Sequence, residues 1–324
     1  PGGHDAGASP ASVVVTRHRH PSGLQRLVVV RTLDVPAGLT EDRVGRRDET
    51  VSVTVTVEAR VAPGVDRVDL EVHVVNPAED HRLRLCFPTG EALTTYRAAT
   101  TFDVADRTTA PVDDEGWEHP ATATFAHQGW IEAHGLVVGA PGLPEAEVTT
   151  DGVVKVTLLR SVGWLARLDP TTRPIPAGPG LATPEAQCPD GVTARLSLRV
   201  VGGDDDTAHL AATQAADELG LRAVPAGDGP LLEPGHSLVA VEPSGVVLSA
   251  LKPAEDGDGL VVRLANPGPD GVTAVVTLGV PVAGAESVRL DETPDGGAVT
   301  LEPGGRLHFD VGPHGLRSVR VRPG

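Results

Sequence analysis

Methionine is absent from this 324-residue chain, and cysteines and aromatic residues are scarce: two Cys, three Trp, one Tyr and four Phe. Two cysteines are too few for a disulfide framework, and a chain of this length does not need one. We therefore expect Cys86 and Cys188 to be small apolar core residues and neither a bridge nor a nucleophile. With so few rings, the core has to be aliphatic. The missing initiator methionine leads us to expect a piece of a longer chain or a processed product.

Basic residues are also few, with 27 Lys+Arg against 44 Asp+Glu and a formal net charge of −17 at pH 7. Such a charge repels phosphate backbones and anionic lipid headgroups, so we expect neither nucleic acid nor a membrane as a partner. No apolar run approaches the roughly 20 residues that cross a bilayer. The N-terminus shows no charged-then-apolar signal pattern. A cytoplasmic location is expected, with export left open because the true N-terminus is expected to be absent.

Glycine (38) and proline (29) are abundant, and apolar residues alternate strictly with polar ones in several segments. Alternation places every second side chain on one face of an extended chain, as in half-buried antiparallel strands. The clearest cases are residues 51–57, 68–74, 83–87 and 196–200. The sequence therefore predicts an all-β fold rich in turns.

One segment departs from alternation. Residues 207–219 carry apolar side chains at helical spacing, with Asp205 and Asp206 available as N-caps and Gly220 placed to end the helix. Residues 223–235 are rich in proline and glycine, and seven short strands follow, including residues 288–290. We predict a large β-domain over residues 1–203, a connecting helix and linker over 204–232, and a small β-sandwich over 233–324.

Possible metal sites are weak in the sequence. Zinc needs three or four ligands, and the two histidine pairs have no visible third ligand, so these histidines are expected to be exposed polar residues: His18, His20, His127 and His134. Residues 255–259 (EDGDG) lack the third ligand and distal Glu of a calcium loop and are predicted to form a hairpin turn. No metal site is expected.

Acidic residues around Trp117 could form a sugar-binding platform, although a solvated loop is the favoured interpretation. The residues concerned are Asp113, Asp114, Glu115 and Glu118. Retaining or inverting glycosidases need two converging carboxylates, and nothing in the spacing selects such a pair. No catalytic residue is therefore assigned.

Five segments together resemble one protein family. They are HVVNPAEDHRLRLCFPTG (residues 73–90), TFDVADR (101–107), residues 134–167, GPGLATPEAQC (178–188) and VVLSALKPAEDGDGLVVRLANP (246–267). Their order resembles the C-terminal β-domains of family 38 glycoside hydrolases, the zinc-dependent retaining α-mannosidases. The resemblance implies a galactose-mutarotase-like antiparallel β-supersandwich followed by a small C-terminal β-sandwich. That family keeps its zinc ligands and nucleophilic carboxylate in an N-terminal α/β module, which nothing in this sequence resembles.

The resemblance implies the non-catalytic C-terminal β-domain portion of an α-mannosidase, which supports the catalytic module, contributes to carbohydrate binding and is inactive alone. The expected partners are the N-terminal catalytic module of the same polypeptide, which would hold the zinc, and mannosides or other carbohydrates. Arg160, Trp164 and Trp130 are the candidates for a substrate cleft at the surface facing that module.

Several alternatives remain for these residues. Arg160 could be a plain strand-end arginine, and the tryptophans could be core residues. The chain as a whole could be a free-standing carbohydrate-binding or adhesion module, or a mutarotase-like sugar epimerase using His127 with Glu132 or Glu145 as acid and base.

Overall fold

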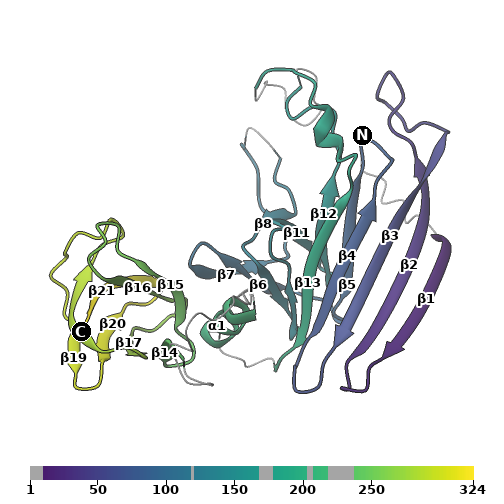
Figure 1. Cartoon of the computed structure of the whole chain (residues 1–324). Coiled ribbons are helices and arrows are strands. Elements are labelled where there is room, and N and C mark those ends of the chain that lie inside the picture. The colour runs from purple at the N-terminus through teal and green to yellow at the C-terminus, as the bar shows by residue number, and fades with distance from the viewer. Residues whose placement is uncertain (1–9, 118–119, 168–177, 203–206, 218–236) are drawn as a thin grey trace. The chain divides into compact units, whose positions relative to one another are not determined.

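The computed structural model describes residues 10–117, 120–167, 178–202, 207–217 and 237–324 (Figure 1). Every strand pairing among them is antiparallel, and the all-β prediction is confirmed. The chain divides into two compact units, a large one within residues 1–98 and 106–202 and a small one within residues 99–105 and 203–324. None of the helices described is long and apolar enough to span a membrane.

The large unit is a sandwich of a nine-stranded and a four-stranded sheet, the predicted supersandwich. The nine-stranded sheet has the order β1 (Pro10–Arg19), β2 (Gln25–Pro36), β3 (Thr50–Val61), β4 (Val68–Val75), β13 (Val192–Val200), β10 (Leu136–Gly139), β9 (Trp130–Ala133), β6 (Thr95–Thr100) and β7 (Asp103–Thr108). The second sheet has the order β5 (Arg82–Pro88), β12 (Val153–Arg160), β11 (Glu145–Val148) and β8 (Thr124–Ala126).

The alternation read from the sequence is the pattern that builds this core. Val53 and Val55 of β3 point inward, while Thr54 between them lies on the outer face. Val154 and Val156 of β12 come from the other sheet and are fully buried in the same aliphatic cluster. The strict period of two therefore fixes which face of each strand meets the core.

The small unit is a sandwich of two four-stranded sheets. One has the order β14 (Val239–Glu242), β17 (Val272–Leu278), β20 (Arg306–Val311) and β19 (Thr300–Glu302); the other has β15 (Val247–Pro253), β16 (Leu260–Asn266), β21 (Gly315–Pro323) and β18 (Val282–Val288). The described residues of this unit form eight strands where seven were predicted. The short, exposed β19 was missed. The strand predicted at residues 288–290 lies instead at residues 282–288, as β18. The alanines and the glycine of β18 give little apolar–polar alternation, so the sequence did not reveal where this strand begins.

The α-helix α1 (Thr207–Asp217) packs beside β15 of the small unit. Its buried side includes Ala208 and Leu210. Gly245 lets the helix come close, because a Cβ atom at that position would lie 3.0 Å from the Cβ of Ala208. The predicted caps Asp205, Asp206 and Gly220, and the end of the predicted helix at Leu219, lie outside the described residues.

Both cysteines are free, as predicted, but Cys86 is not a core residue. It lies on β5, where Leu85 and Phe87 point toward the core. Strict alternation then places Cys86 on the exposed face. Cys188 is half-buried at the end of a short 3₁₀ helix, η1 (Pro184–Gln187).

Candidate functional site

Three loops of the large unit are bound together through one buried amide, and we call them the loop cluster: residues 76–81, 161–164 and 184–188. Asn76 is 3% exposed. Its Nδ2 donates to Ser161 Oγ at 3.2 Å and to the carbonyls of Gln187 and Cys188 at 3.2 and 3.3 Å. Its Oδ1 accepts from His81 Nε2 at 2.8 Å. One side chain therefore fixes segments up to 112 positions apart in sequence.

A second side chain repeats this arrangement at the edge of the cluster. Gln187 Oε1 accepts the backbone N–H of Asp80 at 2.8 Å, and its Nε2 donates to Asp80 Oδ1 at 3.0 Å. Asp80 has the left-handed φ of 54°, which this double contact holds in place. The pKa of the neighbouring His81 is lowered, first by burial and then by Arg46, although Asp80 opposes the shift. The cluster is therefore rigid and its histidine is neutral near pH 7.

A cavity of about 340 Å³ opens beside the loop cluster. Trp164 and Gln187 contribute to its wall, and the β2–β3 connection supplies Arg43. The Arg43 guanidinium carbon lies 3.9 Å from the centroid of the Trp164 ring, a cation–π contact that orients the half-buried ring. Sequence reasoning identified Trp164 but missed Arg43 and Gln187. Gln187 stood in a segment that carried the family resemblance, whereas nothing local marks Arg43.

Arg160 ends β12 immediately before the loop cluster, and its side chain is 59% exposed. Its contact with Glu145 is loose, with 3.9 Å between Nη1 and Oε2. Glu145 is also engaged by Arg82 at 3.4 Å and by the hydroxyl of Thr157 at 2.8 Å. Two arginines therefore share one carboxylate, which leaves positive charge directed toward solvent at this rim.

Trp130 does not fit the site predicted for it. Its side chain is 4% exposed in β9, so the ring offers no face to a sugar or to another module in this structure. The preceding Gly129 has φ 93° and turns the chain into a strand whose four residues are all buried. Trp130 is therefore buried, and it lies on the face of β9 opposite to Ile131 and Ala133, which belong to the sandwich core.

The four histidines considered as metal ligands differ in their exposure to solvent. His18, His20 and His134 are exposed as predicted, but His127 is 3% exposed, and the prediction for it was wrong. The epimerase alternative needs His127 and Glu132 to face an open site. Glu132 is 7% exposed and is engaged by Arg97 at 2.8 Å. Its carboxylate also accepts a backbone N–H, so it has a structural role.

The acidic loop around Trp117 is exposed, as the solvated-loop interpretation predicted. Trp117 itself is 60% exposed. The carboxylate of Asp114 accepts the N–H of Ala121 at 2.8 Å, which uses this side chain to shape the loop. Glu118 lies outside the described residues. The loop brings no second ring beside Trp117 among the residues that the structure describes.

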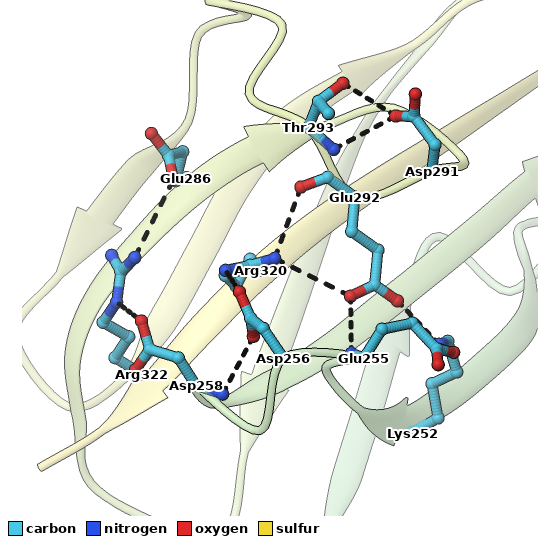
Figure 2. A network of polar contacts seen from close by, with 10 residues as sticks. All are labelled: Lys252, Glu255, Asp256, Asp258, Glu286, Asp291, Glu292, Thr293, Arg320 and Arg322. Carbon is cyan, nitrogen blue, oxygen red and sulfur yellow. Dashed lines mark hydrogen bonds and ion pairs between the residues drawn. The ribbon is translucent and has the colours of Figure 1, made fainter.

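The turn at residues 254–259 connects β15 to β16 as the predicted hairpin. Figure 2 shows its carboxylates pointing at arginines of β21: Asp256 meets Arg320 at 2.7 Å and Asp258 meets Arg322 at 2.8 Å. Glu292 is 6% exposed and lies beside this network. These carboxylates fasten the hairpin to the sheet, and no group of three or more His, Cys, Asp or Glu suited to a metal ion occurs among the described residues.

Comparisons with known proteins show what the chain is similar to. Residues 245–319 match the sequence family "Glycosyl hydrolases family 38 C-terminal beta sandwich domain". Over 271 residues the chain is 30% identical to a protein of Halalkalibacterium halodurans named "Putative mannosylglycerate hydrolase". This alignment covers 76% of the chain and 28% of that protein.

Two solved structures from Enterococcus faecalis have the same fold. One is a protein in the glycosyl hydrolase family 38, with a TM-score of 0.77 and 22% identity, and it matches 95% of this chain over 36% of its own length. The other is an alpha-mannosidase of strain V583, with a TM-score of 0.79 and 23% identity, for which the shares are 95% and 35%. The predicted resemblance to the C-terminal β-domains of family 38 glycoside hydrolases is therefore confirmed. The chain spans no more than 36% of the length of these proteins.

Proposed function

We propose that this chain is the non-catalytic C-terminal β-domain portion of an α-mannosidase-type glycoside hydrolase, and that Arg160 reaches the sugar cleft of an N-terminal catalytic module in the same polypeptide. The observation that carries the proposal is the exposure and the loose pairing of the Arg160 side chain. It is a largely exposed guanidinium, loosely paired, at the end of a buried strand and beside loops that the Asn76 amide holds rigid. Such a group is positioned by the fold and is still free to bind a hydroxyl or a carboxylate.

The surface around Arg160 supports a partner module. Leu165 and Leu181, in the loops next to Trp164, are 73% and 68% exposed. The two loops are joined by a hydrogen bond from the Thr183 N–H to the Gly163 carbonyl at 2.9 Å, and exposed apolar side chains in adjoining loops commonly mark an interface. Interfaces between domains of one chain typically bury about 600 to 1,500 Å². Together with the cavity beside Trp164, these loops offer both a contact surface and a cleft wall.

The substrate we propose is an α-mannoside whose aglycone carries a carboxylate. The relative from Halalkalibacterium halodurans is named for such a compound, a mannoside of glyceric acid. In this chain, Arg82 and Arg160 share the single carboxylate of Glu145, so one guanidinium has unused capacity for a second carboxylate. A neutral aryl mannoside would not use this capacity.

Zinc, which the resemblance implies, does not fit the described residues of this chain. They contain no suitable group of three or more His, Cys, Asp or Glu side chains. Exposed His18 and His20 have no third ligand near them in this set. We therefore assign the metal and the reacting carboxylates to the catalytic module and derive no step through them here.

Replacing Arg160 tests the proposal in the complete enzyme. Arg160→Ala is expected to lower kcat/KM for a mannoside of glyceric acid by about tenfold to a hundredfold, because a charge-assisted contact to the bound substrate is lost. The loss for a neutral aryl α-mannoside should be smaller. The Tm should stay within about 2 °C of the wild type, as for other exposed positions.

Arg60→Ala is the matched control, because Arg60 is 46% exposed and paired on the outer face of β3. It should leave both substrates unaffected. Equal kinetics for Arg160→Ala and the wild type would remove Arg160 from the cleft and leave this unit a scaffold. Equal losses on the acidic and neutral substrates would reject the carboxylate preference alone.

The chain by itself is expected to be inactive. The purified 324 residues should not hydrolyse an aryl α-mannoside and should not retain zinc in stoichiometric amount after dialysis, because the described residues bring together no group of three or more His, Cys, Asp or Glu that could hold a metal ion. Release of the aryl group and metal content are the two measurements. Turnover that follows the protein through purification and is abolished by a chelator would contradict the expectation.

A further inference from the structure

Strand β1 is an exposed edge with an unusually apolar centre. It is the first strand of the nine-stranded sheet, and no described strand pairs with its outer edge (Figure 1). Val13, Val14 and Val15 are 47%, 57% and 53% exposed. An unpaired edge offers a row of free N–H and C=O groups to another strand. Natural proteins commonly protect such an edge with charge or proline, and neither stands at the centre of β1.

The three valines face both sides of the sheet. Val14 pairs with Val30 of β2 on the outer face, whereas Val15 pairs with Val29 on the inner face. A run of consecutive apolar residues is the pattern of a strand that is covered on both faces, unlike the alternation found in β3 and β4. The sequence of β1 is therefore that of an interior strand, although the strand lies at an edge.

The pattern of β1 is also self-complementary. Residues 12–16 read Ser-Val-Val-Val-Thr, with a hydroxyl residue on each side of three valines. Antiparallel pairing of two such strands about Val14 places Val14 opposite Val14 of the second copy and Ser12 opposite Thr16. We propose that two copies of this chain associate through β1, so that the two nine-stranded sheets continue into each other across a two-fold axis.

Charge supports a second copy at this place. The whole chain carries −17, which opposes self-association, yet residues 10–33 contain four arginines and no Asp or Glu. The two copies would therefore meet where neither is acidic. Arg17 of one copy would lie about 20 Å from Arg17 of the other, at about 3.3 Å per residue. That distance exceeds the Debye length of about 8 Å at physiological ionic strength, so the arginines do not repel strongly.

Sedimentation equilibrium of the full 324-residue chain tests this proposal, with a reductant present because Cys86 is free and exposed. The wild type is expected to reach twice its 33.4 kDa at micromolar concentration. Val14→Lys brings two like charges together on the axis and should weaken association about a hundredfold. Val75→Lys is the control, because Val75 is 53% exposed on β4, away from the edge. It should remain dimeric.

Mixing two variants identifies the axis. Val14→Lys and Val14→Glu should each be monomeric, and their equimolar mixture should regain the dimer, because residue 14 of one copy then meets the opposite charge on the other. Circular dichroism checks that both variants are folded. A monomeric wild type, a dimer that survives Val14→Lys, or a mixture that stays monomeric would each overturn the proposal. None of these outcomes bears on Arg160, which lies on β12.

Discussion

The free energy of unfolding is expected to fall by about 3 kcal/mol between about pH 6.5 and about pH 4 because of one residue, His127. Burial lowers the pKa of His127 to about 4 from its ordinary value of 6.5, and a nearby backbone group at Leu143 offsets only part of this. Each pKa unit corresponds to about 1.4 kcal/mol. The difference of between two and three units therefore gives the stated loss.

The surroundings of His127 explain why its neutral form is required. The centroid of its ring lies 6.3 Å from that of Phe125. The Phe125 ring centroid lies 5.0 Å from that of Tyr96, and the guanidinium of Arg107 lies over the Phe125 ring. Neither ring nitrogen of His127 has a hydrogen-bond partner of good geometry among the described residues. A proton added there would be buried with little compensation. Because the folded pKa is depressed, this stability is complete above about pH 6.5 and is lost as the pH falls toward 4.

His127→Phe isolates this contribution. Phenylalanine keeps a neutral ring next to Phe125, so the difference in unfolding free energy between variant and wild type should change by about 3 kcal/mol in favour of the variant as the pH is lowered. Urea unfolding at several pH values measures it. His73→Phe, at an exposed histidine of β4, is the control for the exchange of a histidine for a phenylalanine. Parallel pH curves for His127→Phe and the wild type would mean that His127 takes up a proton as readily in the folded chain as in the unfolded chain.

Alternation allowed the sheet faces to be predicted, and it failed where strands are short or buried on both sides. The valines of β3 alternate with threonines, so their inward face could be read directly. In β9 all four residues are buried, so period two gives no direction for Trp130. His127 follows a strand of three residues, which is too short for alternation to show which side chains point inward. Its burial depends on tertiary packing that no local pattern encodes.

The candidate site was only partly predictable for a similar reason. Arg160 and Trp164 could be selected because they fall in a segment with a family resemblance. The hydrogen bonds that order the neighbouring loops join Asn76 to residues that are 85 to 112 positions away in the sequence. Arg43, which contacts the Trp164 ring, comes from a further loop. A sequence shows which residues can make such contacts, whereas the fold decides which of them meet.

The turn that precedes β12 is expected to tolerate no side chain at Gly152. Gly152 has φ 79°, and an added Cβ would lie 1.7 Å from the carbonyl oxygen of Glu91. The same turn is anchored by Thr89, whose N–H donates to the Gly152 carbonyl at 2.8 Å. Gly152 directly precedes Val153, which pairs with Pro88 at the start of the β5–β12 ladder, so a shift of this turn disturbs the register of the two strands. Because β12 runs from this turn to Arg160, the glycine also sets where Arg160 emerges.

Gly152→Ala should therefore lower the free energy of unfolding by about 3 kcal/mol or more, of which the left-handed backbone accounts for about 1 to 2 kcal/mol and the collision for the remainder. Gly142→Ala separates the two contributions, because Gly142 has φ 77° and nothing within 4 Å of an added Cβ. It should cost only the backbone share. Urea unfolding measures the stability of both variants. If Gly142→Ala folds normally but no folded Gly152→Ala can be recovered, this also shows the larger loss expected for Gly152→Ala. Equal losses would show that the Glu91 carbonyl yields, and the β11–β12 turn would then not fix the start of the strand that carries Arg160.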